Sequence, residues 1–146
     1  EAEAQLANQR YFDADDTYLD VLRLRPDDHM ASIGQIHAQI GVGMIRTASY
    51  KLRRLLLKHP ELISTRYDKK LLPAAQRLRW VQEELTEMTT QSQSVEPPLL
   101  LAYLGFQLDK PRQIRSALDI AVERKPNDPV VLLLRRIWLK DRPATQ

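Results

Sequence analysis

The sequence predicts an all-α fold built from antiparallel helical hairpins, and three observations lead to this class. Apolar residues recur at spacings of three and four along most of the chain, which is the period of a helix with one buried face. A pattern of small, large and apolar positions that ends in proline occurs twice, at an interval of 34 residues. Only 4 of the 146 residues are glycine, so few positions interrupt long helices.

The internal repeat lies between residues 8 and 60. Four positions of the first copy have counterparts 34 residues later, and the pairs are Ala14 and Ala48, Tyr18 and Leu52, Val21 and Leu55, and Pro26 and Pro60. Within each copy the first three members fall at i, i+4 and i+7, on one stripe of a helix that ends at the proline. This arrangement resembles the tetratricopeptide repeat, a 34-residue helix-turn-helix unit with a small residue where its helices cross. The resemblance implies a right-handed α-α superhelix of stacked hairpins that serves as a scaffold for protein partners.

Helices are expected in the first half of the chain over residues 2–8, 12–24, 30–40 and 45–58. Three aspartates near the start of the second helix favour it, because a helix N-terminus attracts negative charge. Asp27 and Asp28 supply caps for the third helix. Gly41 and Gly43 then mark the turn of a hairpin. The fourth helix ends before Pro60, since the residue before a proline resists the α conformation.

The pattern weakens over residues 61–94. We expect a short helix over 61–70, a long helix over 73–90 with Pro73 in its first turn, and a polar loop over 89–94. The periodicity then returns, and prolines begin the last two helices, the second of which covers 129–140. Ile114 occupies the position where the repeat has its small crossing residue. This departure implies either a wider crossing or a shift of that role to Ala117.

These elements predict one domain over residues 1–146. It comprises a partial repeat at 1–26, a repeat at 27–60, a degenerate repeat at 61–94, a repeat at 95–126 and a terminal helix at 127–146. A chain of this length buries about 70% of the surface that its unfolded form exposes, which is enough for one core. Because residues 1 and 2 fall inside the first helix of a repeat, we expect the sequence to be part of a longer chain.

No set of residues in the sequence predicts catalysis or a cofactor. The absence of cysteine excludes disulfides and thiolate zinc sites and leaves the compartment open. His29 and His37 are eight residues apart, which is too far for a pair of helical metal ligands at i and i+4. Gly41-Val42-Gly43 follows a helix and lacks the remaining residues of a phosphate or dinucleotide loop. We therefore expect a protein that is not an enzyme and has no metal or cofactor site.

Charge is distributed unevenly, and the formal net charge of +3 conceals a basic belt. Residues 1–45 carry 8 acids and 3 Lys or Arg, residues 46–80 carry 2 acids and 10 Lys or Arg, and residues 81–146 carry 9 of each. Long-range attraction to the belt would favour an acidic peptide, an anionic lipid or a nucleic acid. Its candidate anion-binding residues are Lys51, Arg54, Arg66, Lys69 and Lys70. A solvated face, or pairing with the acidic first repeat of a neighbouring molecule, is favoured over a nucleic-acid site.

In the tetratricopeptide family the first helix of each hairpin lines a concave groove that accepts peptides or helices. The resemblance places an apolar and aromatic groove wall at Ile33, His37, Ile40, Tyr67, Leu99, Tyr103 and Phe106. Such a wall suits an amphipathic helix or a hydrophobic peptide of a protein partner. For Ile33 and Leu99, an ordinary place in the core is an equal alternative.

The predicted terminal helix is very apolar for the end of a helical array, where one face has no covering repeat. We therefore expect an interface with a second subunit, as in a homodimer, or with a further part of a longer chain, at Leu133, Leu134, Ile137 and Trp138. A helix set deeper in the array is the alternative. The longest weakly polar stretch, 97–108, has 12 residues, whereas a membrane-spanning helix needs about 20.

Overall fold

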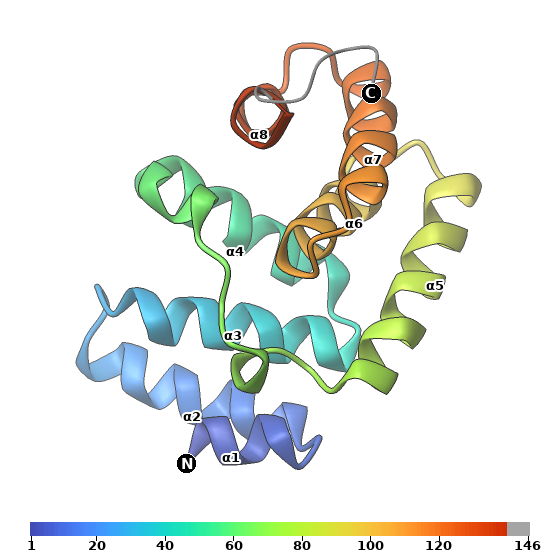
Figure 1. The fold of residues 1–146 in the computed structure, drawn as a ribbon. Coiled ribbons are helices and arrows are strands. Elements are labelled where there is room, and N and C mark those ends of the chain that lie inside the picture. The colour runs from blue at the N-terminus through green and yellow to red at the C-terminus, as the bar shows by residue number, and fades with distance from the viewer. Residues whose placement is uncertain (140–146) are drawn as a thin grey trace. The chain divides into compact units, whose positions relative to one another are not determined.

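The computed structural model describes residues 1–139 and contains, within them, helices and turns but no strand (Figure 1). The elements in chain order are α1 (Ala2–Ala7), α2 (Tyr11–Leu24), α3 (His29–Val42), α4 (Ile45–Lys58), the 3-10 helices η1 (Pro60–Ser64) and η2 (Lys69–Leu71), α5 (Ala75–Gln91), α6 (Glu96–Gln107), α7 (Pro111–Arg124) and α8 (Pro129–Leu139). The predicted all-α class is confirmed for this part of the chain. Position 140, the last of the predicted terminal helix, lies outside the described residues.

The chain forms two compact units, each assembled from two separate stretches. Unit 1 comprises Glu1–Leu55 and Tyr67–Glu83, and unit 2 comprises Leu56–Arg66 and the chain from Glu84 onward. The sequence predicted one domain with repeat boundaries near 26, 60 and 94. The observed boundaries fall inside α4, between η1 and η2, and inside α5, because the degenerate repeat contributes residues 67–83 to unit 1 and residues 61–66 and 84–94 to unit 2.

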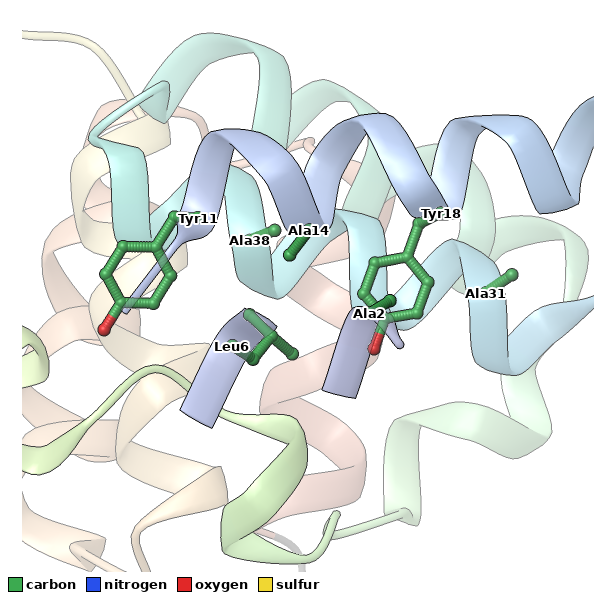
Figure 2. Close-up of a cluster of buried hydrophobic side chains, with 7 residues drawn as sticks. All are labelled: Ala2, Leu6, Tyr11, Ala14, Tyr18, Ala31 and Ala38. Atoms are coloured by element: carbon green, nitrogen blue, oxygen red, sulfur yellow. The ribbon is translucent and has the colours of Figure 1, made fainter. Parts of the chain in front are cut away.

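Small side chains bring α2 close to α3 and α1 in the core of unit 1. Ala14 of α2 and Ala38 of α3 have no accessible surface, and Figure 2 shows them pointing toward each other. Leu6 of α1 is equally buried and belongs to the same cluster. The predicted role of Ala14 as the small residue at a helix contact is therefore confirmed, and its counterpart Ala48 is also fully buried.

Two glycines of α3 provide notches for two tyrosine rings of α2. Gly34 and Gly41 are seven residues apart on α3, as Tyr11 and Tyr18 are on α2. A methyl group at Gly41 would lie 2.7 Å from the Tyr11 ring, and one at Gly34 would overlap the Tyr18 ring. Because heptad-spaced residues lie on one helix face, the two ring-and-notch contacts fix the register of the antiparallel helices.

Aspartates cap helices in both units, and the cap of α3 is one that the sequence predicted. The carboxylate of Asp28 accepts a hydrogen bond from the backbone N–H of Ala31 at 3.0 Å and caps α3. Gly43 ends that helix with φ of 98°, a left-handed conformation that glycine adopts without strain. Asp128 accepts from Val130 and Val131 at the start of α8.

The crossing of α6 and α7 in unit 2 also depends on a glycine, which resolves the departure at Ile114. Gly105 of α6 faces Ile114, and a methyl group on Gly105 would lie 3.2 Å from Ile114 Cγ1 and 3.3 Å from its backbone nitrogen. The helices therefore approach closely although α7 carries a large residue. The small residue of this crossing, Gly105, is on α6 and not on α7. This arrangement differs from both of the alternatives stated above.

The predicted helix over 61–70 is wrong. Only Pro60–Ser64 and Lys69–Leu71 form short 3-10 helices, and residues 65–68 are non-helical. Tertiary contacts explain the difference, because Tyr67 and the backbone carbonyl of Leu71 both contact His37 of α3. These contacts hold residues 67–72 against α3. We call these residues the covering segment.

The predicted loop over 89–94 is shorter than expected, since α5 continues to Gln91. The hydroxyl of Thr89 donates to the Leu85 carbonyl within the helix, at 2.7 Å. Arg124 of α7 donates to the carbonyl oxygens of Thr89 and Ser94. This arginine satisfies backbone groups where the helix ends, which a local sequence pattern cannot reveal.

Candidate functional site

The predicted groove residues of unit 1 are covered by their own chain. Ile33, His37 and Ile40 are buried on α3, and the covering segment lies against them at His37. The Nδ1–H of His37 donates to the Leu71 carbonyl at 2.7 Å, and the edge of its ring meets Tyr67, with 5.6 Å between ring centroids. Burial lowers the pKa of His37 to about 4 although the bond to Leu71 opposes the shift, so the imidazole is neutral at pH 7.

The predicted groove residues of unit 2 also lie in its core. Leu99, Tyr103 and Phe106 are buried on α6. The ring of Phe106 stacks on Trp138 of α8, with 4.8 Å between centroids and 11° between planes. The guanidinium of Arg66 lies 4.2 Å from the Phe106 centroid. Six of the seven predicted groove residues thus expose almost no surface to a partner.

Tyr67 is the seventh predicted groove residue and is half-buried. Burial raises its pKa to about 12, so the phenol stays protonated at neutral pH. Its ring is engaged by His37 of the same unit. For Ile33 and Leu99, the alternative of an ordinary core position agrees with their burial.

Two of the four residues of the predicted oligomer interface on α8 are buried inside unit 2. Leu134 and Trp138 are buried, and the indole N–H of Trp138 donates to the Ile63 carbonyl at 2.9 Å. Leu133 and Ile137 retain partial exposure beside the exposed Leu132. The burial of Leu134 and Trp138 agrees with the alternative of a helix set deeper in the array. The apolar residues of α8 that stay exposed form a narrow strip and not a broad face.

The five predicted anion-binding residues of the basic belt differ in how far they are engaged within their own units. Lys51 donates to the side-chain oxygen of Gln35 at 2.9 Å, and Arg66 of unit 2 is engaged by the Phe106 carbonyl and Asp109. Lys69 and Lys70 are exposed on η2. Arg54 is the member of this set that remains exposed on a long helix.

The outward face of α4 in unit 1 carries exposed basic and aromatic side chains. Arg46, Tyr50 and Arg54 are exposed at i, i+4 and i+8, so they form one stripe along the helix. Tyr50 is 60% exposed, and the guanidinium of Arg54 lies 5.7 Å from its ring centroid. The opposite side of the helix carries the buried Ala48 and Leu52. We call Arg46, Tyr50 and Arg54 the α4 stripe.

The α4 stripe is basic without an acidic counterpart on its own helix. The sequence of α4, IRTASYKLRRLLLK, contains five Lys or Arg and no Asp or Glu. A cationic helix face with an exposed tyrosine is suited to an anionic partner that also offers apolar or aromatic surface. The candidate site therefore consists of these three side chains.

A second exposed stripe, on α2, has the opposite charge. Phe12, Asp16, Asp20 and Leu24 lie at i, i+4, i+8 and i+12 and are all exposed, Phe12 at 68% and Leu24 at 85%. We call these four residues the α2 stripe. Sequence reasoning missed both stripes because it followed the buried positions of the repeat. Large apolar residues off the buried stripe, such as Phe12 and Tyr50, were the signal that could have revealed them.

A polar pocket of about 500 Å³ lies in unit 2, lined by Thr89, Thr90, Gln93, Ile120, Glu123 and Arg124. Its arginine is committed to backbone carbonyls, and Glu123 is the single carboxylate. Within residues 1–139, no three His, Cys, Asp or Glu side chains gather in a way that would hold a metal ion. No helix in this range has both the length and the apolar character to cross a membrane.

No protein-family model, curated protein or solved structure matches this chain.

Proposed function

We propose that this chain is a non-catalytic protein-interaction scaffold whose hairpins stack as in tetratricopeptide proteins, and that it binds an acidic helix of a protein partner on the α4 stripe. The observation that carries the proposal is the exposure of Arg46, Tyr50 and Arg54 along one face of a helix with no acid. The buried groove residues do not support binding in the concave groove that the resemblance implied, which moves the proposed site to the outward face.

The composition of the stripe favours a protein over a polymer of phosphates. Tyrosine and arginine are the residues that most often dominate the free energy of protein–protein binding. The contact between Arg54 and the Tyr50 ring holds both side chains near one geometry, which reduces the entropy lost on binding. A single exposed tyrosine offers one stacking surface, whereas proteins that bind single-stranded nucleic acid use several.

The spacing of the stripe favours a helical partner. Its side chains recur every four residues, which corresponds to a rise of about 6 Å along the helix axis. A partner helix with acidic and apolar residues at the same interval would meet each of them in turn. Opposite charge would also accelerate the encounter and make it sensitive to salt.

Fluorescence anisotropy with a labelled helical peptide that carries glutamates and leucines on one face tests this proposal. We expect Tyr50→Ala to raise Kd by about 10-fold or more, as loss of a hot-spot aromatic does. The double variant Arg46→Glu, Arg54→Glu should abolish binding, and added salt should weaken binding to the unmodified chain.

The matched control for this titration is Arg112→Glu, Lys125→Glu, which changes net charge equally at exposed positions around α7. This control should leave the peptide affinity within about twofold, since neither residue belongs to the α4 stripe and charges outside a contact act weakly through screened solvent. Equal losses in both double variants would contradict a site on α4. Tighter binding of a single-stranded oligonucleotide than of the peptide would contradict a protein partner.

A further inference from the structure

We infer that a second copy of this chain supplies the acidic helix, so that the α2 stripe of one copy docks on the α4 stripe of another. This inference rests on the proposed function of the α4 stripe and names its partner. It is carried by a second observation, which is that the two stripes occupy equivalent positions of consecutive repeats but have opposite charge.

The 34-residue repeat sets a common register for the two stripes. When the helices lie side by side in parallel, with equivalent positions opposite, the facing pairs are Phe12 with Arg46, Asp16 with Tyr50, and Asp20 with Arg54. Both helices advance by about 6 Å per four residues, so the pairs stay matched along the contact.

Each facing pair is chemically complementary. An arginine guanidinium is attracted to the face of an aromatic ring, as Arg46 would be to Phe12. The phenol of Tyr50 would donate a hydrogen bond to the carboxylate of Asp16. Asp20 and Arg54 would form an ion pair, and this pair would exclude other registers that place like charges together.

Neither stripe is covered by another element among residues 1–139. Phe12, Leu24 and Tyr50 are each at least 60% exposed, so neither face is covered. Asp20 lies 3.4 Å from Arg23 on its own helix, but both groups are exposed and such pairs contribute little to stability. The buried sides of α2 and α4 are already committed, through Tyr18 against Gly34 and through Lys51 with Gln35. Both stripes are therefore open to contact by a separate molecule.

The charge distribution supports the same contact at longer range. Residues 1–45 hold 8 acids and 3 Lys or Arg, whereas residues 46–80 hold 2 acids and 10 Lys or Arg. Two copies would attract each other when the first region of one approaches the second region of the other. The contact is small, so we expect a transient association that weakens as salt is added.

A charge-swap experiment by sedimentation velocity tests the contact. The variant Asp16→Arg, Asp20→Arg has two basic stripes, and the variant Arg46→Glu, Arg54→Glu has two acidic stripes. Each variant alone should self-associate at least about 10-fold more weakly than the unmodified chain, because like charges meet at the contact. An equimolar mixture of the two variants should associate again, since each stripe then finds an opposite one.

The inference is overturned if the unmodified chain stays monomeric at every concentration and salt level, or if the mixture associates no better than its components. A matched control, Glu83→Arg, Glu87→Arg, makes the same charge change at exposed positions of α5 and should keep the parent's self-association. Equal weakening by this control would also overturn the inference. Circular dichroism melts of each variant should match the parent, because all altered residues are exposed.

The same variants separate this inference from the proposed function. Asp16→Arg, Asp20→Arg leaves the α4 stripe intact, so it should still bind the acidic peptide while losing self-association. Peptide binding by a chain that never self-associates would remove the second copy as partner and keep the proposed function. Peptide binding that survives Arg46→Glu, Arg54→Glu would remove the proposed function itself.

Discussion

The α2–α3 contact of unit 1 and the α6–α7 contact of unit 2 both depend on small residues, but the equivalent repeat position is small in one and large in the other. In unit 1 the helix α2 carries the small Ala14 at that position, against Ala38 of α3. In unit 2 the helix α7 carries Ile114 at the crossing and α6 carries Gly105. The comparison teaches that a crossing needs a small residue on one of its two helices. A repeat pattern that looks for this residue on one particular helix misses crossings in which the other helix carries it.

The largest expected effect comes from removing the large partner in unit 2. Ile114→Ala should lower the free energy of unfolding by about 2 to 5 kcal/mol, because it leaves a cavity where the side chain is nearly fully buried. Gly105→Ala alone should cost about 1 to 3 kcal/mol by crowding Ile114. Urea titrations of both single variants measure these costs.

The double variant Ile114→Ala, Gly105→Ala sharpens the comparison further. The new methyl group at 105 enters space that the shortened side chain has vacated, so the double variant should lose less stability than the sum of the single losses. Strict additivity would mean that the two residues do not share the crossing space.

A second prediction uses the buried histidine, which distinguishes unit 1 from unit 2. The pKa of His37 is lowered to about 4 in the folded chain, against an ordinary value of 6.5. The unfolded chain therefore binds a proton more readily, and the neutral ring contributes its full stability above pH 6.5. The free energy of unfolding should decrease by about 3 kcal/mol as the pH falls from 6.5 toward 4.

Unfolding curves between pH 7 and pH 4 measure this loss, and the two tryptophans report on different units. Trp80 belongs to unit 1 and Trp138 to unit 2, so variants that keep one tryptophan follow each unit separately. His37→Gln keeps a donor for the Leu71 carbonyl but cannot take up a proton. A pH dependence that is unchanged in His37→Gln would show that other groups cause it.

The smallest predicted effects are those of replacing the two tyrosines that lie between α2 and α3. The Tyr11 hydroxyl accepts a hydrogen bond from the backbone N–H of Ala74 at 3.1 Å, so Tyr11→Phe should cost about 1 kcal/mol. The buried Tyr18 hydroxyl finds no hydrogen-bond partner among residues 1–139. Tyr18→Phe should therefore be neutral or stabilise the fold by up to about 1 kcal/mol. Thermal melts that rank the two variants in the opposite order would contradict this assignment.

Local periodicity predicted the helices well where each helix buries one face. The predicted bounds of α4 agree with the structure, because Ala48 and Leu52 are buried at helical spacing and the glycine turn and Pro60 delimit the helix. The helix over 61–70 was wrong because Tyr67 and Leu71 are held by His37, a residue distant in sequence. A local pattern contains no information about such a contact.

The candidate site was predicted less well than the fold. The groove assignment assumed that the first helices of the hairpins face open space, whereas the covering segment lies over His37 and α8 packs on Phe106. Arg54 was predicted as an anion-binding residue and is exposed on the α4 stripe. Tyr50 and Phe12 were not predicted, because they lie off the buried positions that define the repeat.

Each unit is assembled from two separate stretches of sequence, and this has a consequence for folding during synthesis on the ribosome. Unit 1 needs Tyr67–Glu83 to join Glu1–Leu55, yet Leu56–Arg66 of the other unit is synthesised between them. A nascent chain that has emerged from the ribosome only as far as Leu55 lacks the carbonyl that holds His37 and the backbone donor that Tyr11 needs. Its α3 is left uncovered at His37 until the covering segment, residues 67–72, has also emerged.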